Sequence, residues 1–245
     1  MTPLSAMDLL ALWEGGAGLD ATGRALAVLS GYFREPSGQL ATLGIGERDA
    51  RLLDVYEHLF GPKLKAYVEC PPCGERLEYE LSAAELRAPQ QVTDIERGSL
   101  EFVFRDVAMR LRNPNSLDLV AASRCATPRQ ARRLLAERSV VCASRDGNPV
   151  DPSDLPDDAV VEISSRLARA NPPPEFMIDL HCPACGNATQ QMLAIDEFLW
   201  SKLVALCKRL MLDVDALARV YGWSESEILS MSAARRGKYL ELVLS

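Results

Sequence analysis

The chain has 245 residues, of which 48% are hydrophobic and 25% charged, and its formal net charge is −7. These proportions are ordinary for a soluble globular protein, the excess of acid opposes binding to nucleic acids and anionic membranes, and no apolar run approaches the ~18 residues of a membrane-spanning helix. The N-terminus lacks the basic start and apolar run of a signal peptide, and seven cysteines, an odd number, favour a reducing cytoplasm over a disulfide framework, so we expect a cytoplasmic protein.

Residues 1–62 are predicted to form a helical N-terminal region, because apolar side chains recur there at helical spacing between capping and breaking residues. A serine can cap the first helix by accepting a hydrogen bond from a free backbone N–H group. The expected elements are a helix capped by Ser5 and ended by Gly15, Gly16 and Gly18, a helix over Ala21–Tyr32, and a helix opened by Gly46 and stopped by Gly61 and Pro62.

Two Cys-x-x-Cys motifs follow the same plan in segments 63–89 and 172–194. The first is Cys70-Pro71-Pro72-Cys73-Gly74, and the second is Cys182-Pro183-Ala184-Cys185-Gly186. Each lies between two β-like stretches, and each ends in a glycine that gives the backbone the freedom needed for a tight turn. Both segments are therefore predicted to be β-hairpins with the cysteines at their tips.

Four cysteines in two such pairs are the ligand set of a closed tetrahedral zinc site. We expect Cys70, Cys73, Cys182 and Cys185 to bind one structural Zn²⁺ per chain. A site with four thiolates has no open position for a catalytic water. A redox role is the competing interpretation, but redox Cys-x-x-Cys motifs lie where a strand meets a helix rather than at a hairpin tip. Four thiols without a ligand are the third possibility.

The two motifs are separated by 108 residues, far more than the usual ribbon spacing of about 15–20. We interpret residues 90–171 as a folded insertion between the two halves of one ribbon. In the alternative, each hairpin pairs with a copy from a second chain. The insertion is predicted to contain a loop over 89–94, two strands or a strand and a bend in 100–112, and helices over 117–122, 128–138 and 157–170.

Charge is unevenly distributed in the insertion. Nine arginines and five acidic residues lie between Glu101 and Asp146, whereas Asp151–Glu162 holds five acidic residues and no basic one. Adjacent blocks of opposite sign more often contact each other than bind a ligand. A nucleic-acid-binding or regulatory zinc ribbon that uses the arginines is the alternative, and it is disfavoured by the acidic net charge.

Residues 195–245 are predicted to be helical, with a long helix from Ile195 to about Tyr221 and two short helices capped by Ser224 and Ser232. Aromatic and aliphatic side chains are dense in the last two helices, where they either pack on the long helix or bind a partner. The candidates for partner binding are Tyr221, Trp223, Ile228, Leu229 and Tyr239. The remaining cysteines, Cys125, Cys142 and Cys207, are interpreted as small core residues.

The expected fold class is α+β and mostly helical, with a split four-cysteine zinc ribbon of two β-hairpin knuckles, an inserted α/β segment and helical terminal regions. With two histidines and no nucleophile, phosphate-loop or metalloprotease motif, the sequence gives no support for an enzyme. A non-enzymatic protein-binding or assembly factor fits these residues better.

Leu217–Leu242, with its Tyr-Gly-Trp, Glu-Ile-Leu and Arg…Tyr-Leu blocks, resembles a recurring ending of small phage-tail assembly proteins. The whole chain also has a characteristic layout: helices come first, then Phe-Gly-Pro and Cys-Pro-x-Cys-Gly-Glu-Arg-Leu, an Arg-rich region, a second Cys-Pro-x-Cys-Gly and a long helix with Phe-Leu-Trp. This layout is similar to that of zinc-ribbon baseplate proteins of contractile phage tails and phage-like contractile injection systems. This resemblance implies a component or chaperone of baseplate assembly whose partners are baseplate, hub, tube or tape-measure proteins. Among functional residues, the resemblance implies a role only for the four cysteines, as zinc ligands.

Overall fold

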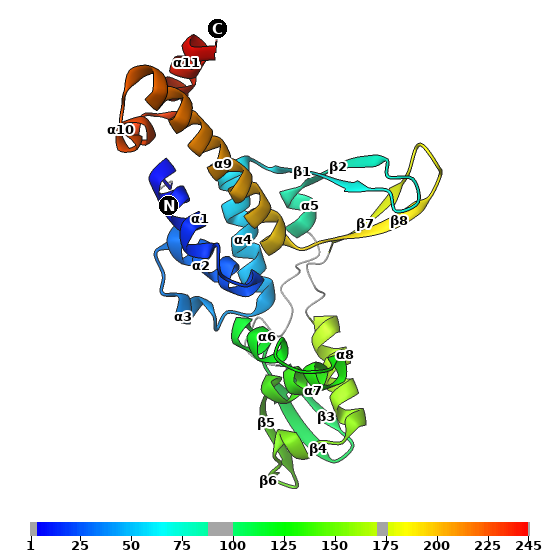
Figure 1. Ribbon diagram of the computed structural model, residues 1–245. Coiled ribbons are helices and arrows are strands. Elements are labelled where there is room, and N and C mark those ends of the chain that lie inside the picture. Colours follow the sequence, from blue (N-terminus) through cyan, green and yellow to red (C-terminus); the bar gives the residue numbers. More distant parts are fainter. Residues whose placement is uncertain (1–3, 88–99, 171–175, 245) are drawn as a thin grey trace. The chain divides into compact units, whose positions relative to one another are not determined.

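A computed structural model describes residues 4–87, 100–170 and 176–244 (Figure 1). Helices predominate over three small antiparallel sheets in this part of the chain, which confirms the α+β, mostly helical fold class. The chain divides into two compact units, one formed by residues 1–37 and 195–245 and the other by residues 38–194. The division into five segments that the sequence suggested stays a prediction. Among the described residues, no helix has the length and apolar character needed to cross a membrane.

The first unit is entirely helical. It consists of α1 (Ala6–Gly16), α2 (Ala21–Phe33), α9 (Ile195–Tyr221), α10 (Glu225–Ser230) and α11 (Ala233–Leu244). These bounds confirm the helices expected at both ends of the chain. Helices α1 and α2 pack on α9, so segments distant in the sequence share one core. Its close packing is evident at Gly16, where an added Cβ atom would lie 2.3 Å from the Trp200 ring.

Polar contacts fix the ends of these helices. Ser5 and Asp8 form a capping box at α1, and Ser224 forms the equivalent box with Glu227 at α10. Helix α11 is tied to α9 by an ion pair between Arg236 and Asp213, in which Nε and Oδ2 are 3.1 Å apart and both side chains are largely buried.

The short helix α3 (Ser37–Leu40), which the sequence did not predict, starts at the last residue of the N-terminal stretch of the first unit and runs into the second unit, where α4 (Ile45–Phe60) follows. A hairpin of β1 (Lys63–Glu69) and β2 (Arg76–Ser82) follows, and then the short helix α5 (Ala83–Arg87). Arg87 donates hydrogen bonds to Glu57 and Asp54 on α4, which holds α5 against that helix. A capping box begins α5, because Ser82 and Glu85 exchange hydrogen bonds there. The loop predicted over 89–94 lies outside the described residues.

The segment 100–170 has its own hydrophobic core. Its elements are β3 (Leu100–Phe104), β4 (Val107–Leu111), α6 (Ser116–Ala122), α7 (Pro128–Ser139), β5 (Val140–Arg145), β6 (Asn148–Pro149), a 3₁₀ turn (Pro152–Asp154) and α8 (Asp157–Ala170). The sheet has the order β3-β4-β5-β6, and Phe102, Met109 and Ala143 on one face pack with Ile163 and Leu167 of α8. The sequence pattern predicted β3, β4 and the helices but not β5, whose alternation is broken by a register shift opposite Arg110 and Leu111.

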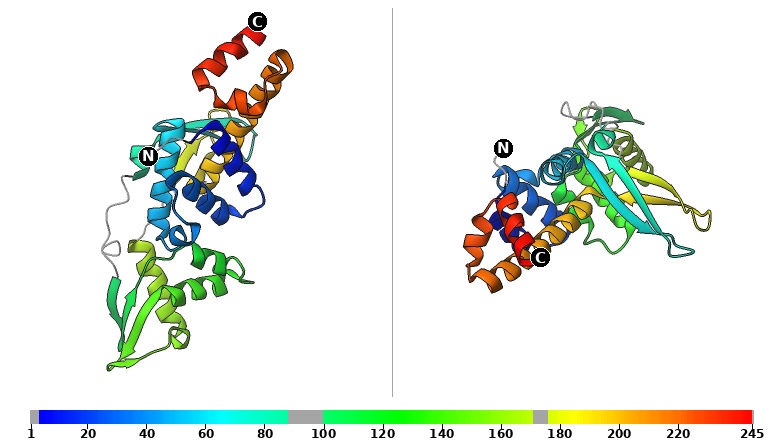
Figure 2. Two further views of the ribbon diagram at one scale, coloured as in Figure 1. Left: turned by 90° about the vertical axis from the view of Figure 1, so that its left-hand side faces the viewer. Right: turned by 90° about the horizontal axis from the view of Figure 1, so that it is seen from above.

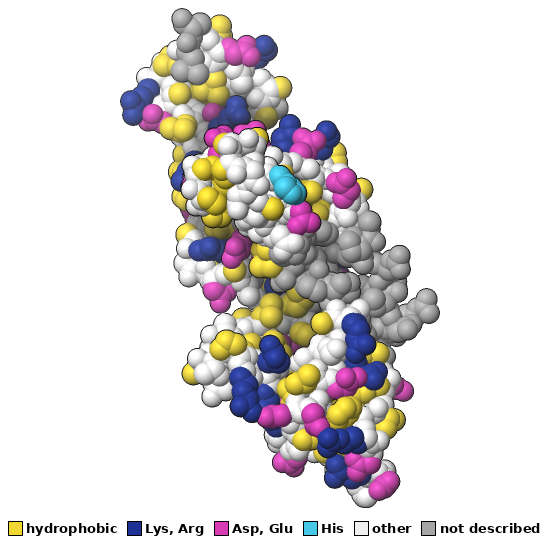
Figure 3. Space-filling view, turned by 90° about the vertical axis from the view of Figure 1, so that its right-hand side faces the viewer, with side chains coloured by type: hydrophobic (Ala, Val, Ile, Leu, Met, Phe, Trp, Pro, Cys, Tyr) yellow, Lys and Arg dark blue, Asp and Glu magenta, His cyan; other side chains and the backbone are white. Residues whose placement is uncertain are grey.

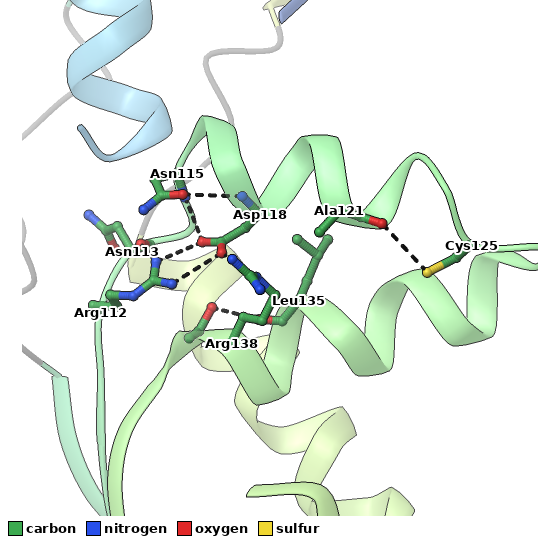
Figure 4. A network of polar contacts seen from close by, with 9 residues as sticks. Arg112, Asn113, Asn115, Asp118, Ala121, Cys125, Leu135 and Arg138 are labelled. Atoms are coloured by element: carbon green, nitrogen blue, oxygen red, sulfur yellow. Dashed lines mark hydrogen bonds and ion pairs between the residues drawn. The ribbon is translucent and has the colours of Figure 1, made fainter. Parts of the chain in front are cut away.

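One buried carboxylate organises this segment (Figure 4). Asp118 has a fully buried side chain and contacts the Arg112 guanidinium through both oxygens, at 2.6 and 3.1 Å, and the Arg138 Nε at 2.7 Å. It also accepts a hydrogen bond from the backbone N–H of Asn115, which closes the capping box of α6. Burial alone would raise the pKa of Asp118, but the hydrogen bonds from Arg112, Asn115 and Arg138 outweigh it and hold the pKa below its usual value. The ends of β4, α6 and α7 thus meet at one carboxylate.

Several arginines of the segment contact its acidic run, as the charge pattern predicted. Arg129 and Arg133 of α7 both pair with Asp157 at the start of α8, and Arg105 pairs with Asp158. Over the segment 100–170, drawn in green in Figure 1, Figure 3 shows basic and acidic side chains next to each other. Exposed pairs of this kind add little stability, but they neutralise much of the local positive charge.

We expect Asp118→Asn to lower the free energy of unfolding by roughly 3 kcal/mol at neutral pH, because Arg112 and Arg138 would lose their buried counter-charge. The pKa of Asp118 is lowered by folding, so its contribution is present above the usual aspartate pKa. It should be lost as the pH falls through the lowered value. Urea unfolding at several pH values measures both effects. Asp157→Asn is the control, since its exposed pairs should contribute no more than about 1 kcal/mol; equal losses for the two variants would contradict the prediction.

Candidate metal centre

Two hairpins bring the four predicted ligands together. Strands β1 and β2 pair from Lys63–Ser82 to Glu69–Arg76, and β7 (Phe176–His181) pairs with β8 (Ala188–Leu193) in the same way. In each hairpin the first cysteine follows directly on the incoming strand. Figure 2 shows the two hairpins, cyan and yellow, extending to tips that lie side by side. Both tips belong to one chain, so pairing of each hairpin with a copy from a second chain is not needed to complete the site.

The two tips have the same backbone hydrogen bonds. The N–H of Cys70 donates to the carbonyl of Glu75, and the N–H of Gly74 donates to the carbonyl of Cys70, each at 2.8 Å. The second tip repeats both bonds at 2.9 Å, with Cys182, Asn187 and Gly186 in the matching places. Gly74 and Gly186 both have φ of +73°, in the left-handed region where a side chain is disfavoured. The conformation of each knuckle is therefore fixed by its own local sequence.

The four sulfur atoms form a compact cluster in which all lie within 4.8 Å of one another. The Sγ atoms of Cys70 and Cys185 are 3.6 Å apart, and so are those of Cys73 and Cys182. Metal–sulfur bonds of about 2.3 Å in a regular tetrahedron would place the sulfurs about 3.8 Å apart. The cluster therefore has the size of a four-thiolate metal site. These two short contacts each join the first cysteine of one knuckle to the second cysteine of the other, which spacing alone did not predict.

The two cysteines of each knuckle differ in exposure. Cys70 and Cys182 are buried together with Leu77, and Val68 and Leu180 pack against them. Cys73 and Cys185 are exposed. One side of the cluster thus rests on apolar side chains and the other faces solvent.

The thiols of the cluster differ in pKa, in part because backbone N–H groups donate to some of the sulfurs. The backbone N–H of Cys185 is the main reason that the pKa of Cys182 falls to about 7, whereas burial raises the pKa of Cys70 to about 12. The N–H of Cys73 also points at the sulfur of Cys70 and counteracts part of this rise. Such N–H groups stabilise negative charge on sulfur, which is the form in which cysteine binds a metal.

The other cysteines lie outside the cluster. Cys207 is buried in the first unit, where its Sγ is 3.5 Å from the carbonyl oxygen of Leu9, in agreement with the predicted core role. Cys125 is half-buried. Cys142 is exposed on β5, so its interpretation as a core residue was wrong; its side chain points to the face of the sheet opposite the core residue Ala143.

The candidates for partner binding divide into two groups within the first unit. Tyr221 and Trp223 stack with ring centroids 4.4 Å apart, and Tyr239 meets both rings edge-on at 5.6 and 4.9 Å. We call these three residues the aromatic cluster; Tyr221 is exposed and the other two are half-buried. Ile228 and Leu229 are buried beneath the surface of the unit, where they pack rather than present a surface.

A family model described as T4 bacteriophage base plate protein matches residues 26–200, a range that includes both knuckles and the segment between them. No curated protein and no solved structure matches the chain.

The cluster should bind a thiol-seeking metal ion with one site per chain. We expect Co²⁺, used as a coloured probe, to give the absorption of a tetrahedral thiolate complex and to saturate at about one equivalent. Cys73→Ser should abolish this absorption, because it removes one of the four ligands. Cys142→Ser is the matched control, an exposed cysteine outside the cluster, and it should saturate like the parent. An unchanged spectrum for Cys73→Ser would contradict the four-sulfur site.

Proposed function

The chain belongs to the family of T4 bacteriophage base plate proteins, and from this membership we propose that it is a non-enzymatic component or assembly chaperone of a contractile phage-like tail or injection system, stabilised by one structural Zn²⁺. The observation that carries the proposal is the position of the four-cysteine cluster inside the region that the family model matches. Membership of this family supports association with other baseplate components. The bound zinc and the role in assembly are the further parts of the proposal.

Zinc is the metal that best suits the cluster. Four cysteine sulfurs in tetrahedral array are typical of structural zinc, with iron–sulfur chemistry as the other common use of such a set. The ligands would be Cys70, Cys73, Cys182 and Cys185, and the bound ion would hold the tips of two hairpins that share few other contacts. Since all four positions would be filled by protein sulfur, the ion would stabilise the fold and would not activate a water.

A non-enzymatic role is supported by the contacts of the charged side chains, which are engaged in ion pairs and helix caps within the chain. The deeply buried carboxylate of Asp118 is occupied by two arginines and a helix cap. Among the residues that the structure describes, the four cysteines are the one group of three or more potential ligands that converge. The contacts of Arg129 and Arg133 with Asp157 likewise favour a solvated, neutralised surface over the nucleic-acid-binding alternative.

We place the partner surface at the aromatic cluster. Tyrosine and tryptophan carry much of the binding energy of protein interfaces, because their large rigid rings lose little entropy on contact. Tyr221, Trp223 and Tyr239 are held in a fixed arrangement by mutual stacking yet keep part of their surface accessible. Hub, tube and tape-measure proteins of the same tail are the partners to test.

We expect the purified protein to contain about one Zn²⁺ per chain by elemental analysis. Removal of the ion by a chelator should lower the melting temperature sharply, because the free energy of metal binding is also free energy of folding. Cys182→Ser should melt like the chelated parent and respond little to chelator, whereas Cys142→Ser should behave like the untreated parent. A metal-free protein that melts at the same temperature with and without added Zn²⁺ would sink the zinc proposal.

Co-expression with the tail's own hub, tube and tape-measure proteins tests the assembly role. We expect the chain to co-purify with at least one of them. Trp223→Ala and Tyr239→Ala should each weaken this capture at least tenfold, since aromatic anchors contribute ~2 kcal/mol or more, with a smaller effect on the melting temperature. Tyr67→Ala, which removes an exposed tyrosine on β1, is the control. Variants that stay folded and bind as before would move the partner surface elsewhere, and capture of none of these proteins would count against the assembly role.

A further inference from the structure

The four-cysteine cluster has two sides that differ in their access to solvent. Cys73 and Cys185 are exposed, whereas Cys70 and Cys182 are only 1% and 2% exposed. A dissolved oxidant can therefore reach one sulfur of each knuckle directly. Redox-active cysteines share this arrangement, in which an accessible thiolate lies next to a second cysteine that reacts with its oxidised form.

For each exposed sulfur, a buried sulfur of the other hairpin lies close enough to be that second cysteine. The Sγ atom of Cys73 is 3.6 Å from that of Cys182, and the Sγ atom of Cys185 is 3.6 Å from that of Cys70. The two sulfurs of a disulfide are about 2.0 Å apart, so each pair has to approach by roughly 1.5 Å. Rotation of the side chains about their Cα–Cβ bonds can supply a movement of this size.

The backbone that presents the sulfurs does not depend on a metal ion. In the first knuckle, the N–H groups of Cys70 and Gly74 donate to backbone carbonyls of the same turn, and the second knuckle repeats these bonds. Val68 and Leu180, one from each hairpin, pack against the buried cysteines and Leu77. Loss of the metal ligands during oxidation would therefore leave both turns and the apolar contact between the hairpins in place.

We propose that the ribbon is a redox switch, in which hydrogen peroxide converts the four cysteines into two disulfides between the hairpins, Cys73–Cys182 and Cys70–Cys185. This inference rests on the proposed function, because it concerns the regulation of the same metal site. In the reduced state the thiolates hold a metal ion, and in the oxidised state covalent bonds join the same two tips.

Each disulfide forms in two steps and consumes one molecule of peroxide. The thiolate of Cys73 attacks a peroxide oxygen, an S–O bond forms as the O–O bond breaks, and hydroxide leaves; the sulfur, oxidised by two electrons, is now a sulfenic acid. The thiolate of Cys182 then attacks that sulfur, an S–S bond forms as the S–O bond breaks, and a second hydroxide leaves. The buffer protonates both hydroxides to water. Cys185 and Cys70 react in the same way with a second peroxide.

Oxidation exchanges one link between the hairpins for another. Two disulfides leave no thiolate for a metal ion, which binds cysteine in its deprotonated form. The tips stay joined, because both bonds connect knuckles that are separated by 108 residues. A disulfide that closes so long a loop restricts the unfolded chain strongly. A thiol reductant breaks both bonds and returns the chain to its metal-binding form.

The test treats the full-length, zinc-loaded chain with hydrogen peroxide, in a Cys142→Ser background that removes the exposed cysteine outside the cluster. We expect release of about one Zn²⁺ per chain, an intact mass lower by four hydrogens, and disulfide-linked peptides that join Cys73 to Cys182 and Cys70 to Cys185. Dithiothreitol should restore four thiols and the binding of added Zn²⁺. Disulfides within a knuckle, or oxidation beyond sulfenic acid without disulfides, would overturn the proposal.

Thermal unfolding tests whether the oxidised tips remain joined. The oxidised chain should melt at the same temperature with and without chelator, and above the reduced, metal-free chain. Equal melting of the oxidised chain and the reduced, metal-free chain would contradict the link. The peptide map can also be made on a chain purified without metal. Absence of zinc would therefore refute the proposed ion, while the map still decides the redox inference.

Single variants separate the two disulfides. After peroxide treatment, Cys73→Ser should retain the Cys70–Cys185 peptide, and Cys185→Ser should retain the Cys73–Cys182 peptide, because each exposed sulfur reacts with its own partner on the other hairpin. A folded Cys73→Ser chain that instead links Cys182 to Cys185 would show that the partners lie within one knuckle, against the proposal.

Discussion

The meeting of two hairpin tips at four sulfurs is the constraint on which the split ribbon of the second unit depends. The cysteines of the two knuckles are separated by 108 residues of chain, and closing a flexible loop of that length costs about 4 kcal/mol in conformational entropy. The apolar contacts at the tips are limited to Leu77 and a few partly buried neighbours. The proposed structural metal ion, worth ~10 kcal/mol or more, would offset the closure.

The segment between the knuckles can be long because it folds on its own core. Its sheet and helices bury Phe102, Met109 and Ile163 against one another, and Asp118 joins the ends of three elements through its two arginines. A segment stabilised in this way does not need the ribbon to hold its shape. The ribbon in turn tolerates the insertion, because each knuckle is defined by hydrogen bonds within about six residues of its first cysteine.

The charged and the aromatic side chains of the surface differ in how far they are occupied by contacts within the chain. Several arginines of the segment 100–170 are paired with acidic side chains: Arg105 with Asp158, Arg129 with Asp157 and Arg138 with Asp118. The aromatic cluster at the end of α9 keeps part of its surface accessible.

Local features of this protein could be read from its sequence. The bounds of α9 and the caps at Ser5 and Ser224 follow from side-chain periodicity and short-range hydrogen bonding, and the knuckles follow from Cys-Pro-x-Cys-Gly, because each depends on neighbours a few residues away. Tertiary structure decided the short contact between the sulfurs of Cys70 and Cys185, the central role of Asp118, the burial of Ile228 and the exposure of Cys142. Each of these depends on groups that the chain brings together from distant positions, and periodicity within one element contains no information about which distant element will cover it.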